Sequence, residues 1–162
     1  MLVPMRSPLS LDRLHGRSSP MAALLDAWRQ ARDERGMLPS RDDLAVGELL
    51  EGLDFTGWLH VAAPRPARFH FALGETAGAT PLSGLAPVAS HGDDLKAAAR
   101  HLYDDLASAA FTGAALLHRV AHPDDPHMPE VARLILPFAG DGRHVDGLLV
   151  CGIAESPTAT LH

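Results

Sequence analysis

The last apolar segment of the chain restricts the fold more than any other feature. Leu148, Leu149, Val150, Cys151 and Ile153 follow one another with only a glycine between them. A strand with apolar side chains on both faces normally lies inside a sheet that is covered on both sides. We therefore expect residues 144–154 to form a central strand, with a layer of structure on each face of the sheet.

Four further strands are predicted from alternating apolar and polar residues. Residues 57–63 and 67–74 show this alternation, and the prolines of Ala63-Pro64-Arg65-Pro66 favour a turn between them. Residues 114–122 and 130–138 form a second group, and Gly140-Asp141-Gly142 is a suitable turn into the last strand. The sequence thus predicts two strands, then an interval, then three strands.

Helices are expected before the first strand and in the interval. Ser19-Pro20 is a typical helix start, and Gly36 a typical stop. Ser40 and Asp43 have the spacing of a capping box, which precedes a short second helix. The longest helix starts near Ser90 and Asp93, after a Gly- and Pro-rich stretch of irregular turns. Its apolar stripe comprises Leu95, Ala98, Ala99, Leu102, Leu106 and Ala109.

Length and composition indicate one domain in a cytoplasmic protein. The chain has 162 residues and a net charge of -6, without the clustered Lys and Arg that phosphate contacts need, so nucleic acid is not an expected partner. Cys151 is the sole cysteine, and no apolar run approaches the roughly 18 residues that span a membrane. We divide the chain into a flexible leader (1–18), one domain (19–155) and a C-terminal tail (156–162). The domain comprises a helical cap (19–56) and a core (57–155).

Four motifs occur in an order that is typical of one family. LLDAWRQARDERGMLPSRDDL runs from Leu24 to Leu44, and RFHFALG from Arg68 to Gly74. Leu82-Ser83-Gly84 and the strand RLILPF at 133–138 follow. Taken together, over roughly residues 20–155, the chain resembles the short, stand-alone bacterial PAS-like sensory domains.

The resemblance implies an α+β fold with a five-stranded antiparallel sheet. The last strand would lie beside the first, the long helix would cover one face, and the N-terminal amphipathic helix is the candidate cover for the other. A ligand pocket would lie between the long helix and the sheet, lined by Phe69, Phe71, Leu73, Leu102, Leu106, Leu134 and Leu136. The chain departs from the family at Glu75, where threonine is expected, and in a shortened interval from Gly74 to Gly84. If that interval closes the pocket, the same residues form plain core.

Other chemistry has weak signals. The cluster His122, Asp124, Asp125 and His127 has metal-type ligands, but its prolines favour a solvated hairpin loop. His101 corresponds to the histidine with which haem-binding PAS sensors bind iron, but it lies about 120° from the apolar stripe of its helix. His60 and His70 are candidate pH sensors across the first hairpin, with packing as the simpler interpretation. In the apolar last strand, Cys151 is expected to be inert. No cofactor is therefore assigned, and neither haem nor metal is expected.

The sequence favours a regulatory function over catalysis. It lacks the Gly-x-Ser-x-Gly elbow and the phosphate-binding glycine loop, so we expect no enzyme activity. The expected function is sensory signalling: a small apolar ligand in the pocket would change contacts with a partner protein. The alternative is a ligand-free, constitutive interaction or dimerisation module. A homodimer is expected, with Met21, Leu24, Leu25, Trp28 and Trp58 as interface candidates, unless the first helix folds back on its own sheet.

Overall fold

The last strand occupies the middle of the sheet, as its two apolar faces predict. In the computed structural model, β6 (Gly147–Glu155) pairs with β5 (Glu130–Phe138) on one side and with β2 (Phe55–Arg65) on the other. The sheet is antiparallel and has the order β1-β4-β5-β6-β2-β3, with β4 at Leu116–Ala121 and β3 at Arg68–Gly78. The structure describes residues 5–11, 19–44, 46–65, 68–78, 93–121 and 130–155. The protein is therefore α+β, with a sheet built around β6.

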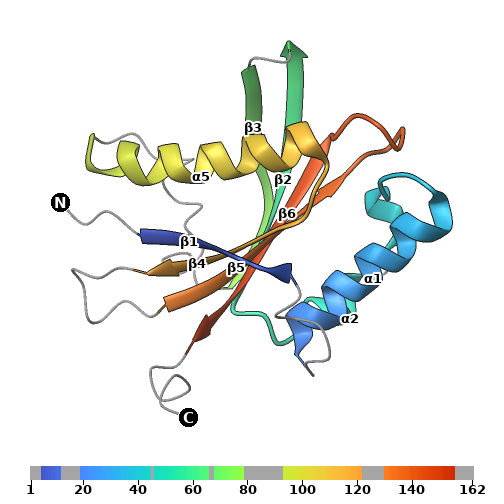
Figure 1. Ribbon diagram of the computed structural model, residues 1–162, viewed down its shortest axis with the longest axis horizontal. Helices are drawn as coiled ribbons and strands as arrows, with labels where there is room; N and C mark the ends of the chain where they lie inside the picture. Colours follow the sequence, from blue (N-terminus) through green and yellow to red (C-terminus); the bar gives the residue numbers. More distant parts are fainter. Residues whose placement is uncertain are drawn as a thin grey trace.

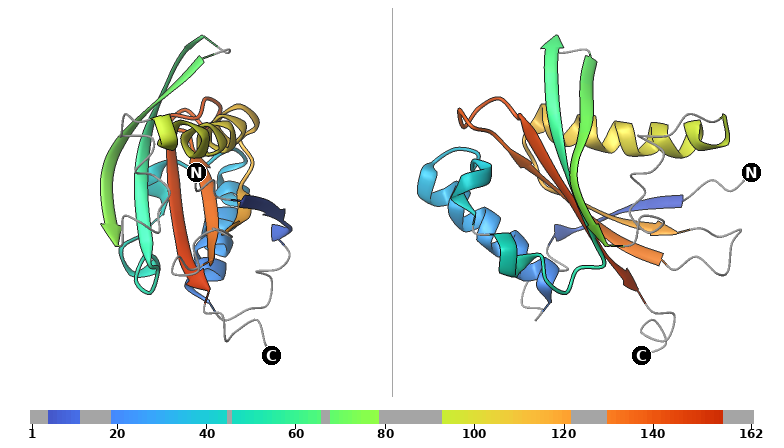
Figure 2. Two further views of the ribbon diagram at one scale, coloured as in Figure 1. Left: turned by 90° about the vertical axis from the view of Figure 1, so that its left-hand side faces the viewer. Right: turned by 180° about the vertical axis from the view of Figure 1, so that it is seen from behind.

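Two helices cover opposite faces of this sheet. Side chains alternate along β6, so that Leu148 and Val150 join the cluster under α5 (Asp93–Thr112), while Leu149 and Cys151 join the cluster under α1 (Pro20–Arg35). In Figure 1, α5 crosses in front of the sheet, and the far ends of β2 and β3 extend past it. Figure 2 shows the β2–β3 hairpin in front of α5 when the molecule is seen from behind. Both faces of β6 are thus removed from water.

The first helix is defined at both ends by its sequence. The Ser19 side chain accepts a hydrogen bond from the Ala22 backbone N–H, and Gly36 ends the helix with a φ of 73°. The buried face consists of Met21, Ala22, Leu24, Leu25 and Trp28. Trp28 fixes the helix to the sheet, because its indole N–H donates to the Pro137 carbonyl of β5 at 2.8 Å. The helix therefore packs on the sheet of its own chain.

The turn that follows α1 is held against the β5–β6 turn. The Arg35 guanidinium donates to the carbonyl oxygens of Ala139 and Gly140, at 3.0 and 2.8 Å. The backbone N–H of Leu38 donates to the Gly142 carbonyl, and a Cβ on Gly142 would lie 1.9 Å from the Met37 sulfur. Gly142 also has a φ of 81°, so glycine is required there by both space and backbone conformation. These contacts hold the Met-Leu-Pro-Ser-Arg turn against the Gly-Asp-Gly turn.

Next along the chain come two short helical turns. The capping box is present at the 3-10 helix η2 (Arg41–Asp43), where the Ser40 N–H donates to the Asp43 carboxylate at 2.8 Å. Hydrogen bonds from the backbone and side chain of Ser40, with Arg35 nearby, hold the pKa of Asp43 below its usual range. α2 (Val46–Leu49) follows, and β2 starts at Phe55, within the segment assigned to the helical cap.

The sequence missed one strand, so the sheet has six strands and not the expected five, and it ended another strand too early. Residues 5–9, assigned to a flexible leader, form β1 (Met5–Leu9), an edge strand that pairs with β4. β3 continues to Gly78, through residues expected to form irregular turns, and the register with β2 shifts opposite Trp58. A strand as short as β1 is too brief to show a clear alternation of apolar and polar residues, so its pairing depends on the edge that the folded sheet offers. Residues 1–4 and 12–18 of the leader, residues 79–84 of the Gly74–Gly84 interval and the tail lie outside the described residues.

Within the described part of the chain, no helix combines the length and the apolar character that crossing a membrane requires.

Replacing Trp28 by Phe tests the link between α1 and β5. The variant keeps most of the buried apolar area but removes the N–H, which leaves the Pro137 carbonyl without this donor. We expect the free energy of unfolding, measured by urea denaturation, to fall by about 1–3 kcal/mol. Gln30→Ala, on the exposed side of the same helix, should change it by less than about 0.5 kcal/mol. Equal effects of the two substitutions would show that the indole hydrogen bond does not hold the helix.

Candidate functional site

The interface between α5 and the sheet is the candidate site, and apolar side chains form most of it. Leu102 and Leu106 on α5 are 2% and 0% exposed, as expected. They belong to one contact cluster with Phe55, Leu59, Ala109, Val131, Ile135, Leu148 and Val150. Gly152 allows the Phe55 ring to pack directly against the backbone of β6, because an added Cβ would lie 2.3 Å from that ring. The cluster is thus built from α5 and from the strands β2, β5 and β6.

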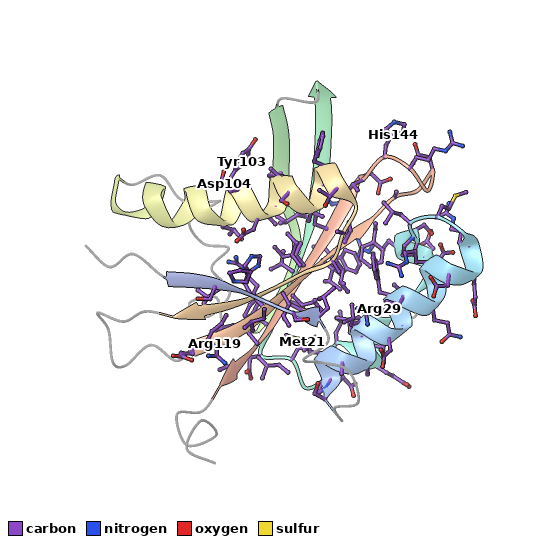
Figure 3. All side chains as sticks on the ribbon, viewed as in Figure 1. Met21, Arg29, Tyr103, Asp104, Arg119 and His144 are labelled. Carbon is purple, nitrogen blue, oxygen red and sulfur yellow. The ribbon has the colours of Figure 1, made fainter. Side chains whose placement is uncertain are left out.

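Phe71 lies at the margin of this interface. It is half-buried, contacts the cluster, and meets Tyr103 of α5 edge to face with ring centroids 5.5 Å apart. Figure 3 shows Tyr103 on the upper side of α5, where β2 and β3 extend past the helix. The backbone of Leu73 pairs with Leu59, but the side chains of Phe69 and Leu73 lie outside the described residues. Among the three ligand-binding candidates on β3, Phe71 is the one whose contact with the interface the structure describes.

The structure corrects the assignment of Leu134 and Leu136. Both are 0% exposed, but they pack in the cluster under α1, with Trp28, Trp58 and Phe138. The α5 side of β5 carries Val131 and Ile135 instead. Because Leu134, Ile135 and Leu136 are consecutive apolar residues, periodicity did not distinguish the two faces. These two leucines therefore cannot line a pocket under α5.

A buried polar cluster at the same interface was missed in the sequence. Asp105 of α5, Arg133 of β5 and His118 of β4 are 4%, 4% and 8% exposed. The Asp105 Oδ2 atom lies 2.5 Å from the Arg133 Nη2 atom, and Oδ1 lies 3.6 Å from the His118 Nε2 atom. His118 and Arg133 are direct neighbours across the β4–β5 ladder. One signal was available, since Asp105 falls within the apolar stripe between Leu102 and Leu106.

The buried cluster acts as an anchor between the helix and the sheet. An Arg–carboxylate pair is directional, so it holds α5 at one rotation and one position along β5. Removing both charges from water offsets much of their attraction, so the pair contributes specificity of packing more than net stability. The cluster therefore gives an otherwise apolar interface a single preferred arrangement.

The five dimer-interface candidates are already covered within one chain. Met21, Leu24, Leu25, Trp28 and Trp58 are each no more than 5% exposed, and all lie in the cluster under α1. Figure 3 shows Met21 between α1 and the sheet. Because α1 folds back on its own sheet, these residues offer no open surface to a second copy.

The remaining candidates from the sequence are the cysteine and the histidines. Cys151 is fully buried, and burial raises the pKa of its thiol to about 12, as expected for an inert side chain. His60 is exposed, whereas the side chains of His70 and His101 lie outside the described residues. The cluster from His122 to His127 also lies outside them. Among the side chains that are described, no group of three or more His, Cys, Asp or Glu is arranged to hold a metal.

Comparisons of this chain with protein-family models, with curated proteins and with solved structures find no match.

A double-mutant cycle tests the buried ion pair. Asp105→Asn leaves the Arg133 charge in the interior without its counter-ion, so it should lower the free energy of unfolding by about 3–5 kcal/mol. In a cycle of Asp105→Leu, Arg133→Met and the double variant, the double variant should lose several kcal/mol less than the sum of the single ones. Asp104→Asn, at the exposed neighbouring position, is the control and should have little effect. Additive losses within about 0.5 kcal/mol would contradict a direct interaction.

The buried thiol predicts a pH dependence of stability. With the folded pKa raised to about 12, the unfolded chain loses its thiol proton near pH 8.5 while the folded chain keeps it. The unfolded state then binds fewer protons, so stability falls as the pH rises between these values. From pH 8 to pH 10 the wild type should lose about 2 kcal/mol more than Cys151→Ala, measured by urea denaturation. Parallel pH profiles of the two proteins would contradict this assignment.

Proposed function

We propose that the protein is a PAS-like sensory or signalling module that regulates a partner protein. The observation that carries the proposal is the sheet order β4-β5-β6-β2-β3, in which β6 lies between β5 and β2. The long helix between the two groups of strands covers one face of that sheet. The resemblance to PAS-like domains, which rests on the sequence motifs, implies both of these features. β1 pairs with β4 at the edge of the sheet and adds a sixth strand to the five that the resemblance implies.

In the sensory form of this proposal, a small apolar ligand binds between α5 and the sheet. Leu102, Leu106 and Phe71 remain lining candidates, and the corrected register replaces Leu134 and Leu136 with Val131 and Ile135. The Asp105–Arg133 pair would be the polar group nearest such a ligand, because it joins the same two elements. A ligand that moved α5 would have to break or shift this pair. The pair thus makes α5 a candidate element for transmitting ligand occupancy.

The alternative is a ligand-free interaction module, and two exposed side chains of α5 favour it. Phe111 is 74% exposed and Tyr103 is 38% exposed, although both are large apolar or aromatic residues. Exposed aromatic side chains are frequent in protein interfaces, where they bury much area at a small entropic cost. This form needs no cavity under α5, and the described side chains there already pack against one another.

The remaining parts of the proposal concern location, catalysis and assembly. We place the protein in the cytoplasm, as a regulator without enzyme activity, and we retain the homodimer as a prediction. Since α1 is packed in its own chain, such a dimer would use a surface other than the five candidates or would exchange α1 between copies. Neither nucleic acid nor membrane is a proposed partner.

Native mass spectrometry with an absorption spectrum, followed by a thermal-shift screen, distinguishes the two forms. The sensory form predicts a retained small molecule, or stabilisation by a fatty acid or another apolar metabolite. Stabilisation should be reduced in Ile135→Ala, which enlarges the α5 side of β5, and unchanged in Gln30→Ala. If nothing is retained and no compound raises the melting temperature, the sensory form is wrong and the interaction module stands. A bound haem or flavin would contradict the small-ligand assignment.

A further inference from the structure

A surface pocket lies on the α1 side of the sheet, opposite the interface described above. Its volume is about 340 Å³. Its lining comes from η2, β2, the end of β5 and the start of β6, and consists of Arg41, Trp58, Leu59, His60, Phe138, Asp146 and Gly147. The volume is near the lower end of the range for ligand pockets, about 300–1,000 Å³, so it suits a small metabolite better than haem or flavin.

Gly147 lines the pocket with backbone alone. Gly147 pairs with His60 of β2 on one side and with Phe138 of β5 on the other, so these two residues flank a bare backbone position. A Cβ added to Gly147 would have one neighbour within 4 Å, the Leu59 carbonyl oxygen at 3.7 Å. That separation is ordinary van der Waals contact. Neither space nor backbone strain therefore requires glycine here, in contrast to Gly142, and the space above it is open.

The pocket has aromatic walls and groups of both charges. The rings of Trp58 and Phe138 lie 5.1 Å apart at an angle of 54°, and the Arg41 guanidinium lies 4.4 Å from the centre of a Trp58 ring. The cation–π contact and the Ser40–Asp43 capping box beside it orient Arg41. The pocket thus combines an apolar wall with a guanidinium group that can bind a carboxylate.

Asp146 supplies the opposite charge from a fixed backbone position. Its N–H donates to the Phe138 carbonyl at 3.0 Å, and its carbonyl accepts from the Val61 N–H at 2.9 Å. One carboxylate oxygen, Oδ2, accepts from the Gly140 N–H at 2.9 Å. The residue is exposed, so its carboxylate is accessible to a ligand from solvent. A preorganised carboxylate costs little ordering entropy when it binds a cationic group.

We propose that this pocket binds a free α-amino acid with an apolar side chain. The carboxylate would pair with Arg41, the ammonium group with Asp146, and the side chain would lie over Gly147 between His60 and Phe138. A simple anion would face Asp146 and a simple amine would face Arg41, so a ligand carrying both charges is the better complement. The site lies on the opposite face of the sheet from α5 and does not depend on the PAS-like proposal.

Isothermal titration calorimetry with three small probes tests the ligand chemistry. L-leucine should bind, whereas 4-methylpentanoate lacks its ammonium group and 3-methylbutylamine lacks its carboxylate. Each of these should bind at least about tenfold more weakly than L-leucine. L-phenylalanine is a second amino acid probe with a larger apolar group. The proposal is overturned if neither amino acid binds at concentrations up to about 10 mM. It is also overturned if 4-methylpentanoate binds as well as L-leucine, which would indicate a plain anion site.

Gly147→Val tests the location, because it fills the pocket at a strand position that accepts a β-branched residue. It should abolish L-leucine binding while the melting temperature stays at or above that of the wild type. Gly47→Val is the matched control, since Gly47 is exposed in α2 with nothing within 4 Å of an added Cβ, and it should bind normally. Asp146→Asn should reduce L-leucine affinity to that of 4-methylpentanoate. Unchanged L-leucine binding by a folded Gly147→Val variant would overturn the assigned site.

Discussion

Burial of β6 on both faces is the constraint on which the rest of the structure depends. A strand this apolar is stable only when each face is covered, and the two helices meet that need from opposite sides. α5 covers Leu148 and Val150, whereas α1 covers Leu149 and Cys151. The same constraint accounts for α1 folding on its own chain, because the face it covers would otherwise expose a large apolar surface.

Polar contacts then determine how each helix sits on its face. Trp28 and Arg35 attach α1 to carbonyl groups of β5 and of the β5–β6 turn. Asp105 and Arg133 attach α5 to the middle of the same strand. Hydrophobic burial is non-directional, so it brings helix and sheet together without selecting one register. Directional bonds select it, and β5 receives them on both of its faces.

The attachment of α1 also shapes the surface pocket. Arg35 and the Leu38–Gly142 hydrogen bond hold the turn before η2 against the β5–β6 turn. This places Arg41 above Trp58, on the same side of the sheet as the gap at Gly147. The motif that suggested a family from the sequence thus has a physical role. It joins two turns that lie about a hundred residues apart and leaves a small open space beside them.

The sequence alone determined most of the elements and the centre of the sheet. Local patterns were sufficient for the helix from Ser19 to Gly36 and for the central position of β6, because capping and two-faced burial are expressed in consecutive residues. Tertiary structure decided which face Leu134 and Leu136 occupy, since neighbouring apolar residues carry no period. It also decided the pairing of β1 and the partners of Asp105 and Gly147. The role of a buried charge, or of a glycine in a strand, depends on residues far away in the chain, and only folding brings those residues together.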